Sequence, residues 1–152
     1  MTVNIKNKKG FTLIELLVVI SIIGILAALI MTNFNAARGR ARDAQRKSDL
    51  RQISTSLRMY YNDNNLYPLT ADLTFGSDFS GGEMIYMKYV PHDPSWEEVG
   101  DPDYVYSRLI ADPNDYFCLV ATLENASDGD IAKTQLRCSG CGSGNQYAVC
   151  AE

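Results

Sequence analysis

The sequence predicts an α+β protein in which one long N-terminal helix packs on a small antiparallel sheet. Three observations lead to this prediction. Residues 11–31 form an apolar run whose one charged residue is Glu15. Residues 32–61 contain no proline and continue in an amphipathic helical pattern. Residues 62–152 then alternate strand-like runs with segments rich in Gly, Pro, Asp, Asn and Ser.

The apolar run has the length and composition of a membrane span. Its 21 residues would make a helix about 31 Å long, which is enough to cross the core of a bilayer. A buried core helix is the alternative, but such a helix normally shows a polar stripe, and this run has none. A cleaved secretory signal is the other alternative, with a small-residue site near Ala36 and Ala37. It fits less well, because the run is long for such a segment and Glu15 lies near its start.

The second half of the predicted helix needs a surface to pack against. Apolar side chains recur there at spacings of three and four, which places them on one face. They are Leu50, Ile53, Leu57 and Tyr60 or Tyr61. The helix should end near residues 62–65, ahead of Pro68. Residues 11–61 then form one helix about 75 Å long.

Four runs rich in Tyr, Val, Phe and Ile predict the strands that cover this face. They are residues 84–90, 104–109, 116–123 and 146–151. The segments 70–83, 91–103 and 124–145 are predicted as long loops, which often carry function.

Length and composition limit the function classes. The chain has 152 residues, 46% of them hydrophobic. This fits at most one ordinary domain with a small addition, and it excludes both a large multidomain enzyme and a wholly disordered chain. No nucleophile elbow or phosphate-binding glycine loop is present. The lone His92 lies in a turn-forming Pro-His-Asp-Pro stretch and is interpreted as an exposed loop histidine, so we expect no enzyme activity.

The segment before the apolar run carries a specific motif. Lys6, Lys8 and Lys9 lead to Gly10, and the sequence Phe-Thr-Leu-Ile-Glu opens the apolar run. This order resembles the class III signal of type IV pilins and of the related type II secretion pseudopilins. The resemblance implies that a membrane prepilin peptidase removes residues 1–10 by cleaving after Gly10. It also implies N-methylation of the new N-terminus at Phe11 and the type IV pilin fold.

Glu15 occupies the position of a glutamate that this family uses in assembly. A charged group inside a membrane span costs at least about 2.5 kcal/mol on insertion scales, so it needs a reason to be there. Cleavage after Gly10 would create an ammonium at Phe11, four residues before Glu15. This ammonium could pair within one helix or, as the family implies, with Glu15 of a neighbouring chain. The alternative is that Glu15 simply extends to the membrane interface.

The resemblance extends to the stem and implies a function. The helical segment after residue 38 is similar to the stem of G-type pseudopilins and of small pilins close to them. The expected parts are therefore a leader (1–10), a membrane and filament-core segment (11–31), a basic stem (32–61) and an extracytoplasmic head (62–152). We expect a structural subunit of a type IV pilus-like filament, anchored in the inner membrane and then part of a surface or periplasmic filament. The alternatives are the major pseudopilin of a type II secretion system and a monomeric membrane-tethered binding module. Its expected partners are the prepilin peptidase, identical and related subunits, the inner-membrane assembly platform and the lipid bilayer.

Charge is opposed between the stem and the head. The net charge is −4, but residues 32–60 carry +5 and residues 61–152 carry −11. The basic side chains of the stem are Arg38, Arg40, Arg42, Arg46, Lys47, Arg51 and Arg58. Helical spacing predicts local pairs between Asp43 and Lys47 and between Asp49 and Arg46. The excess charge could face solvent, anionic lipid, the acidic head of a neighbouring subunit or nucleic acid, although the basic run lacks the interleaved aromatic residues typical of nucleic-acid binding.

Four cysteines lie in the head, where the family's orientation would favour disulfides. An antiparallel pairing of residues 116–123 with 146–151 sets Cys118 opposite Cys150. This predicts a 118–150 bridge with a second bridge between Cys138 and Cys141. Bridges 118–138 and 141–150 are the alternative, and a zinc site or a redox site at Cys-Ser-Gly-Cys is less compatible with the spacing and the loop.

The oxygen-rich segment 124–130 is a candidate calcium site. Some pseudopilins of the resembling branch hold calcium in their C-terminal loops, which makes Asp128 and Asp130 the candidate ligands. Calcium needs six to eight oxygen ligands, and no EF-hand pattern is present. No other cofactor is expected.

Overall fold

The computed structural model describes residues 10–111 and 114–151. The chain divides into two compact units, Met1–Arg38 and Gly39–Glu152. The helix α1 (Leu13–Asn64) continues from one unit into the other. The sequence predicted this helix over residues 11–61, so its bounds differ by two or three residues at each end.

In the first unit, α1 is apolar from Leu13 to Met31, and no other part of the described chain covers it. Every described large side chain from Phe11 to Met31 is exposed, Phe11 to 78% and Met31 to 73%. Its most apolar window has a mean hydropathy of 3.0 and buries none of its residues. The helix is long and apolar enough to cross a membrane, as the sequence predicted.

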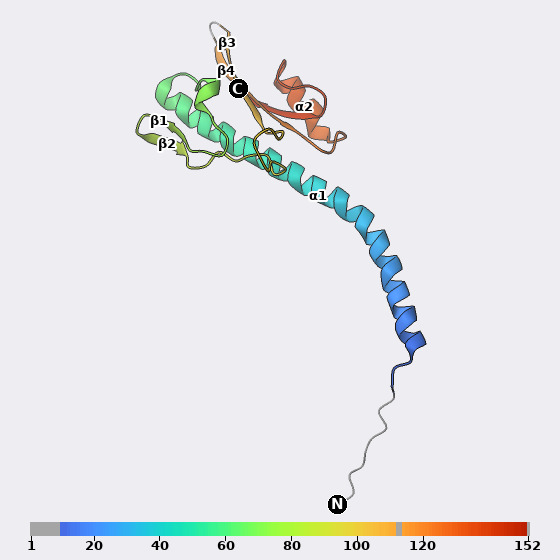
Figure 1. Cartoon of the computed structure of the whole chain (residues 1–152). Helices are drawn as coiled ribbons and strands as arrows, with labels where there is room; N and C mark the ends of the chain where they lie inside the picture. The colour runs from blue at the N-terminus through green and yellow to red at the C-terminus, as the bar shows by residue number, and fades with distance from the viewer. Residues whose placement is uncertain (1–9, 112–113, 152) are drawn as a thin grey trace, which may run out of the picture. The chain divides into compact units, whose positions relative to one another are not determined.

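The second unit is an α+β head built around the C-terminal half of α1 (Figure 1). After α1 come the short helix η1 (Thr70–Asp72) and the strands β1 (Phe79–Gly81) and β2 (Met84–Met87). The strands β3 (Val105–Ala111) and β4 (Asn114–Thr122), the helix α2 (Gly129–Arg137) and the strand β5 (Gln146–Cys150) follow. β1 and β2 pair as one antiparallel sheet, and β3, β4 and β5 form a second in that order.

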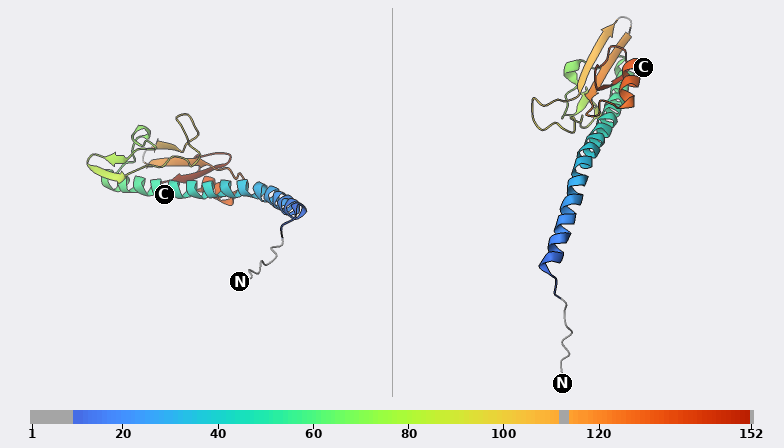
Figure 2. Two further views of the ribbon diagram at one scale, coloured as in Figure 1. Left: turned by 60° about the horizontal axis from the view of Figure 1, so that its bottom comes forward. Right: turned by 90° about the vertical axis from the view of Figure 1, so that its right-hand side faces the viewer.

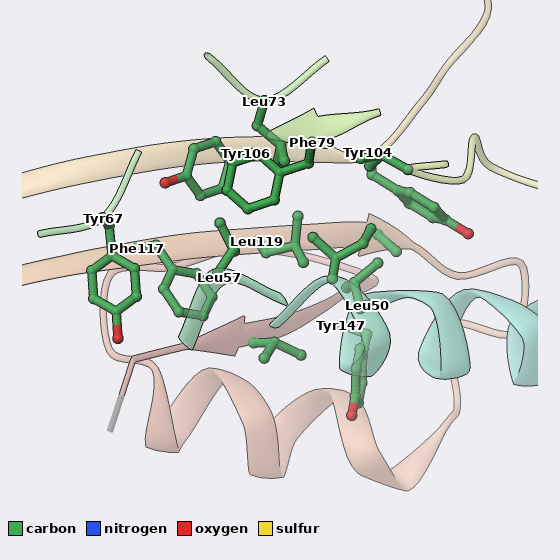
Figure 3. Packing of buried hydrophobic residues seen from close by; sticks show 14 of the residues in the cluster. Leu50, Leu57, Tyr67, Leu73, Phe79, Tyr104, Tyr106, Phe117, Leu119 and Tyr147 are labelled. Atoms are coloured by element: carbon green, nitrogen blue, oxygen red, sulfur yellow. The ribbon is translucent and has the colours of Figure 1, made fainter. Parts of the chain in front are cut away.

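The core forms where α1 meets the three-stranded sheet. Leu50, Ile53 and Leu57 of α1 are fully buried, as the predicted apolar stripe requires. They pack in one cluster with Phe117 and Leu119 of β4 (Figure 3). The stem of the helix is thus part of the head's core.

Three elements were absent from the prediction. The short helix η1 and the three-residue strand β1 both lie inside the predicted loop 70–83. α2 lies inside the predicted loop 124–145, so that prediction was wrong over residues 129–137. Asp128 begins α2, because its side chain accepts a hydrogen bond from the N–H of Asp130 at 2.9 Å.

Candidate functional site

Thr12 and Glu15 together form the beginning of α1. The Thr12 N–H and hydroxyl both donate to Glu15 Oε2, at 2.9 and 2.6 Å, and the Glu15 N–H donates to Thr12 Oγ1 at 3.3 Å. This reciprocal capping box satisfies backbone donors that a helix end otherwise leaves free. This role of Glu15 was not predicted, although the Thr-x-x-Glu spacing indicates it. Gly10 and Phe11 lie just before the cap and are exposed, whereas Lys6, Lys8 and Lys9 lie outside the described residues.

The basic stem binds the head through Arg46. This side chain is 3% exposed and donates to both carboxylate oxygens of Asp93, at 2.7 and 2.9 Å. It also donates to Asp43 at 2.7 Å and to Glu124 at 2.9 Å. Asp43 in turn accepts the N–H groups of Glu124 and Asn125, both at 2.9 Å. Arg46 therefore fixes the segments around residues 93 and 124 against α1.

The electrostatics of this cluster follow from burial and pairing. The pKa of Arg46 is raised, because its hydrogen bonds to the carboxylate of Asp93 outweigh the effect of burial. Burial raises the pKa of Asp93, but the hydrogen bonds from Arg46 and Ser95 outweigh it and leave the pKa lowered. The described residues contain no buried side-chain nitrogen or oxygen without a hydrogen-bond partner. The cluster is thus a satisfied ionic network.

Lys47 joins the stem to the start of α2. Its Nζ lies 2.7 Å from Asp128 Oδ1 and 2.8 Å from Asp130 Oδ2. These hydrogen bonds from Lys47 lower the pKa of both aspartates. The two residues predicted as calcium ligands are thus brought together, with the Lys47 ammonium between them. No described group of three or more His, Cys, Asp or Glu side chains could hold a metal ion.

Arg42 completes the contacts between the stem and the head. Its guanidinium makes two hydrogen bonds to Glu124, each of 2.6 Å. This pair and the hydrogen bond from Arg46 lower the pKa of Glu124 from 4.5 to about 2. Because both partners are more than one third exposed, solvent screening limits what the pair adds to stability.

The predicted local pairs of the stem were wrong. Asp43 pairs with Arg46 rather than Lys47, and Asp49 accepts the Tyr104 hydroxyl at 2.9 Å rather than pairing with Arg46. Spacing along one helix could not show that carboxylates of the head would pair with Arg46 and Lys47. The remaining basic side chains of the stem, all exposed, are Arg38, Arg40, Arg51 and Arg58. The guanidinium of Arg38 lies over the Phe34 ring, 4.9 Å from its centroid.

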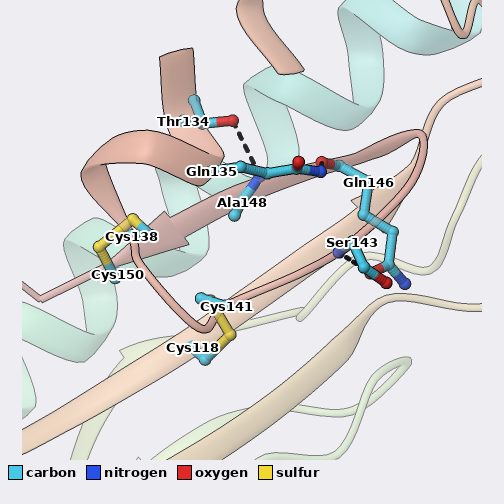
Figure 4. Close-up of a disulfide and its surroundings, with 9 residues drawn as sticks. All are labelled: Cys118, Thr134, Gln135, Cys138, Cys141, Ser143, Gln146, Ala148 and Cys150. Carbon is cyan, nitrogen blue, oxygen red and sulfur yellow. Dashed lines mark hydrogen bonds between the residues drawn. A yellow bond between two sulfur atoms is a disulfide. The ribbon is translucent and has the colours of Figure 1, made fainter. Parts of the chain in front are cut away.

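The cysteines form two disulfides, but in the third possible connectivity. Cys118 bonds Cys141, and Cys138 bonds Cys150 (Figure 4). The predicted strand register was right, because Cys118 and Cys150 are Cα partners in the sheet. The predicted 118–150 and 138–141 bridges were wrong, and so was the alternative of 118–138 with 141–150.

The reason for the observed disulfides is the missed helix α2. It ends at Arg137, and the N–H of the next residue, Cys138, donates to Thr134 O at 2.8 Å; a turn then leads to Cys141. Thr134 accepts the Ala148 N–H at 3.3 Å, which holds α2 against β5 (Figure 4). Cys138 therefore reaches β5 and Cys141 reaches β4. All four cysteines are bonded to one another, so none is free to bind zinc.

His92 is less exposed than predicted. Its Nδ1 lies 2.5 Å from Asp103 Oδ2, and its ring stacks on Trp96 with centroids 3.7 Å apart. The other oxygen of Asp103 accepts the Asp93 and Tyr104 N–H groups at 2.9 and 2.8 Å. The histidine thus holds the 91–103 loop together.

Comparisons with known proteins agree with this arrangement. The family model described as the prokaryotic N-terminal methylation motif matches residues 5–31. The type II secretion system core protein G of Aeromonas hydrophila is 32% identical over 141 residues, which cover 87% of this chain and 96% of that protein. The chain therefore belongs to the family of type IV pilins and type II secretion pseudopilins.

Other members of the pilin and pseudopilin family match over a shorter part of the chain. The type IV wide pilus major component PilA4 of Thermus thermophilus is 52% identical over 62 residues, or 41% of this chain and 47% of that protein. The type IV major pilin protein PilA of Myxococcus xanthus is 37% identical over 61 residues, or 40% of this chain and 28% of that protein. These matches span less than half of either relative. No solved structure matches the chain.

Proposed function

We propose that this chain is the precursor of a filament subunit that is cleaved after Gly10, N-methylated at Phe11 and polymerised through its N-terminal helix. The observation that carries the proposal is the match of residues 5–31 to the methylation motif, in a segment where every described large apolar side chain of α1 up to Met31 is exposed. A surface of this kind needs lipid before assembly and other helices after it. Burial of apolar helices against each other would hold the filament.

Glu15 is the residue we propose for assembly. Before cleavage its carboxylate accepts two hydrogen bonds from Thr12. Cleavage would add an ammonium at Phe11, within reach of the Glu15 of the same or a neighbouring chain. Glu15→Leu should insert and be cleaved normally but fail to form filaments, as negative-stain microscopy of sheared surface material would show.

A matched variant separates assembly from capping. Thr12→Val removes the hydroxyl that donates to Glu15 but keeps the carboxylate, so it should still form filaments. Wild-type filament levels in Glu15→Leu would contradict the assembly role. Filament loss in both variants would instead assign the effect to the helix cap.

The type II secretion pseudopilus is a second candidate, and one observation favours it. Protein G of Aeromonas hydrophila matches over 96% of its length, whereas the two pilins match over 47% and 28% of theirs. A gene cluster with an outer-membrane secretin and minor pseudopilins would support secretion, and a retraction ATPase would support a pilus. Loss of exported enzymes from the medium of a deletion strain separates the two directly.

We place the head outside the cytoplasm, with the inner membrane as the site of insertion. Two disulfides support this orientation, since such bonds persist in oxidising compartments. The prepilin peptidase and the inner-membrane assembly platform are the partners this requires, and no catalysis is proposed. Protease treatment of spheroplasts should digest the head; a protected head would reverse the orientation.

Calcium binding and nucleic-acid binding stay predictions. A calcium ion at Asp128 and Asp130 would have to displace the Lys47 ammonium. Calcium should therefore raise the melting temperature of Lys47→Ala more than that of the unchanged chain.

The remaining alternative is a monomeric membrane-tethered binding module. Absence of filaments under all conditions would favour it.

A further inference from the structure

One face of the stem remains positively charged after the ion pairs within the chain are formed. Arg42, Arg46 and Lys47 are paired with carboxylates. Arg51 and Arg58 are exposed and make no ion pair with a described residue. This part of the stem therefore carries two cations that the head does not neutralise.

Arg51 and Arg58 lie on the same face of α1. They are seven residues apart, which is close to two helical turns, so their Cα atoms are separated by about 10.5 Å along the axis. Thr55 between them is exposed, and its hydroxyl donates to Arg51 O at 2.9 Å. The next acid along the helix, Asp63, accepts the Tyr86 hydroxyl at 2.9 Å. Arginine side chains are long and flexible, so two guanidiniums at this spacing can both reach a pair of neighbouring carboxylates.

The 96–101 segment presents such a pair. Glu97 and Glu98 are exposed, and Val99 beside them is 95% exposed. Neither glutamate makes an ion pair with a described residue. The loop that carries them projects from the body of the head in both views of Figure 2.

This segment is held in shape by its own hydrogen bonds. Asp101 Oδ2 accepts the N–H groups of Glu97 and Glu98, at 2.8 and 3.0 Å. At its start, the Trp96 ring stacks on His92. An ordered loop loses little conformational freedom when it binds, which favours its use as a contact.

We propose that Glu97 and Glu98 of one copy bind Arg51 and Arg58 of a second copy, with Val99 at the centre of the contact. The inference rests on the proposed function, since it names the surfaces through which subunits meet. The two patches are different surfaces of one chain, so the contact is heterologous. A heterologous contact that does not close into a ring extends into a filament.

Charge reversal tests the contact. Arg51→Glu with Arg58→Glu should lower the yield of sheared filaments at least about tenfold, because like charges placed opposite each other oppose association. Glu97→Arg with Glu98→Arg should do the same, and the two changes combined should restore filaments. Lys133→Glu, on the exposed side of α2 (78% of its side chain exposed), is the matched control and should leave the yield unchanged. Failure of the combined variant to recover any yield would overturn the proposal.

A crosslinking experiment can detect the contact between two copies even where no filaments form. A photoreactive phenylalanine at Val99 should give a crosslinked dimer whose second attachment maps to residues 51–58. The same probe at Leu136, which is 85% exposed on α2, should not map there. A crosslink at 51–58 in cells without filaments would keep the contact and reject the proposed function. A Val99 probe that yields no such dimer, or arginine variants that lose DNA binding but keep full filament yield, would reject the contact.

Discussion

Arg46 is the residue on which the ion pairs between the helix and the head converge. It contacts Asp43 on its own helix, and Asp93 and Glu124 from two distant segments. Removal of one partner from a buried ion network leaves the others charged, desolvated and unpaired. Substitution of Arg46 should therefore cost more stability than substitution of an exposed arginine of the same helix.

We expect Arg46→Met to lower the free energy of unfolding by about 3–5 kcal/mol, the usual cost of breaking a buried pair. Trp96 is the one tryptophan of the chain and stacks beside Asp93 on His92, so its fluorescence should report urea unfolding in detergent. Arg40→Met, at an exposed position, should stay within about 0.5 kcal/mol of the unchanged chain. Equal losses in the two variants would contradict the role of the network.

Acid should destabilise the head through the same carboxylates. The pKa of Glu124 is lowered to about 2, and those of Asp93, Asp128 and Asp130 are also lowered. A lowered folded-state pKa gives stability that is present above the unfolded value and lost as pH falls toward the folded value. The urea midpoint should therefore fall between about pH 5 and pH 2.

Asp49 contributes with the opposite sign. Burial raises its pKa, so the folded state favours the protonated acid and loses this advantage as pH rises. Glu124→Gln should flatten the acid loss, whereas Asp49→Asn should steepen it. An unchanged pH profile in Glu124→Gln would show that its ion pairs are screened by solvent.

At the scale of elements, the long helix and the main strands could be predicted, but the pairings across them could not. The apolar stripe at Leu50, Ile53 and Leu57 depends on local periodicity, which the sequence shows directly. Arg46 and Asp93 are 47 residues apart, and Lys47 and Asp128 are 81 apart. Spacing along one helix carries no information about such contacts.

The short helix α2 was missed for a different reason. It has nine residues and begins at Gly129, after an oxygen-rich segment that also fits a metal-binding loop. Its signals were the Asp128 cap and Arg137 in the last turn. Because α2 was not predicted, the disulfide pairing was predicted wrongly as well, since the helix determines where Cys138 and Cys141 lie.

The disulfides should stabilise β5 and α2 against the rest of the head. The bridges close segments of 23 and 12 residues, and the chain-entropy relation assigns about 3 kcal/mol to each. Cys118→Ser with Cys141→Ser should lose about that much stability in urea unfolding. Cys118→Ser alone should leave Cys141 as the alkylated thiol in peptide mass spectrometry. Alkylation at Cys150 instead would contradict the connectivity.

At the scale of the whole molecule, a single copy leaves two kinds of surface without a partner. One is the apolar half of α1, and the other is the arginine face at Arg51 and Arg58. Screening by salt weakens contacts of the arginine face, which depend on exposed charges, but does not weaken contacts of the apolar half of α1. A pilin-type subunit that uses both should respond to ionic strength in the head contacts alone.

Filaments should loosen as salt rises. The Debye length falls from about 10 Å at 0.1 M to about 3 Å at 1 M, which weakens exposed ion pairs but not buried apolar contacts. Sedimentation after shearing should give shorter filaments at 1 M NaCl, with subunits that stay folded by Trp96 fluorescence. Filaments of equal length at both concentrations would count against the arginine face.

The shared use of α1 also affects the order in which the chain is made. Leu57 is synthesised 89 residues before Gln146, the first residue of β5. At 5–20 residues per second, its core partners on that strand follow about 4–18 s later. During this interval the stem is a basic amphipathic helix with an uncovered apolar face, and the surface of an anionic membrane favours such a helix. We therefore expect the newly synthesised stem to bind the membrane surface and to dissociate from it only when β5 has been synthesised and can pack on the helix.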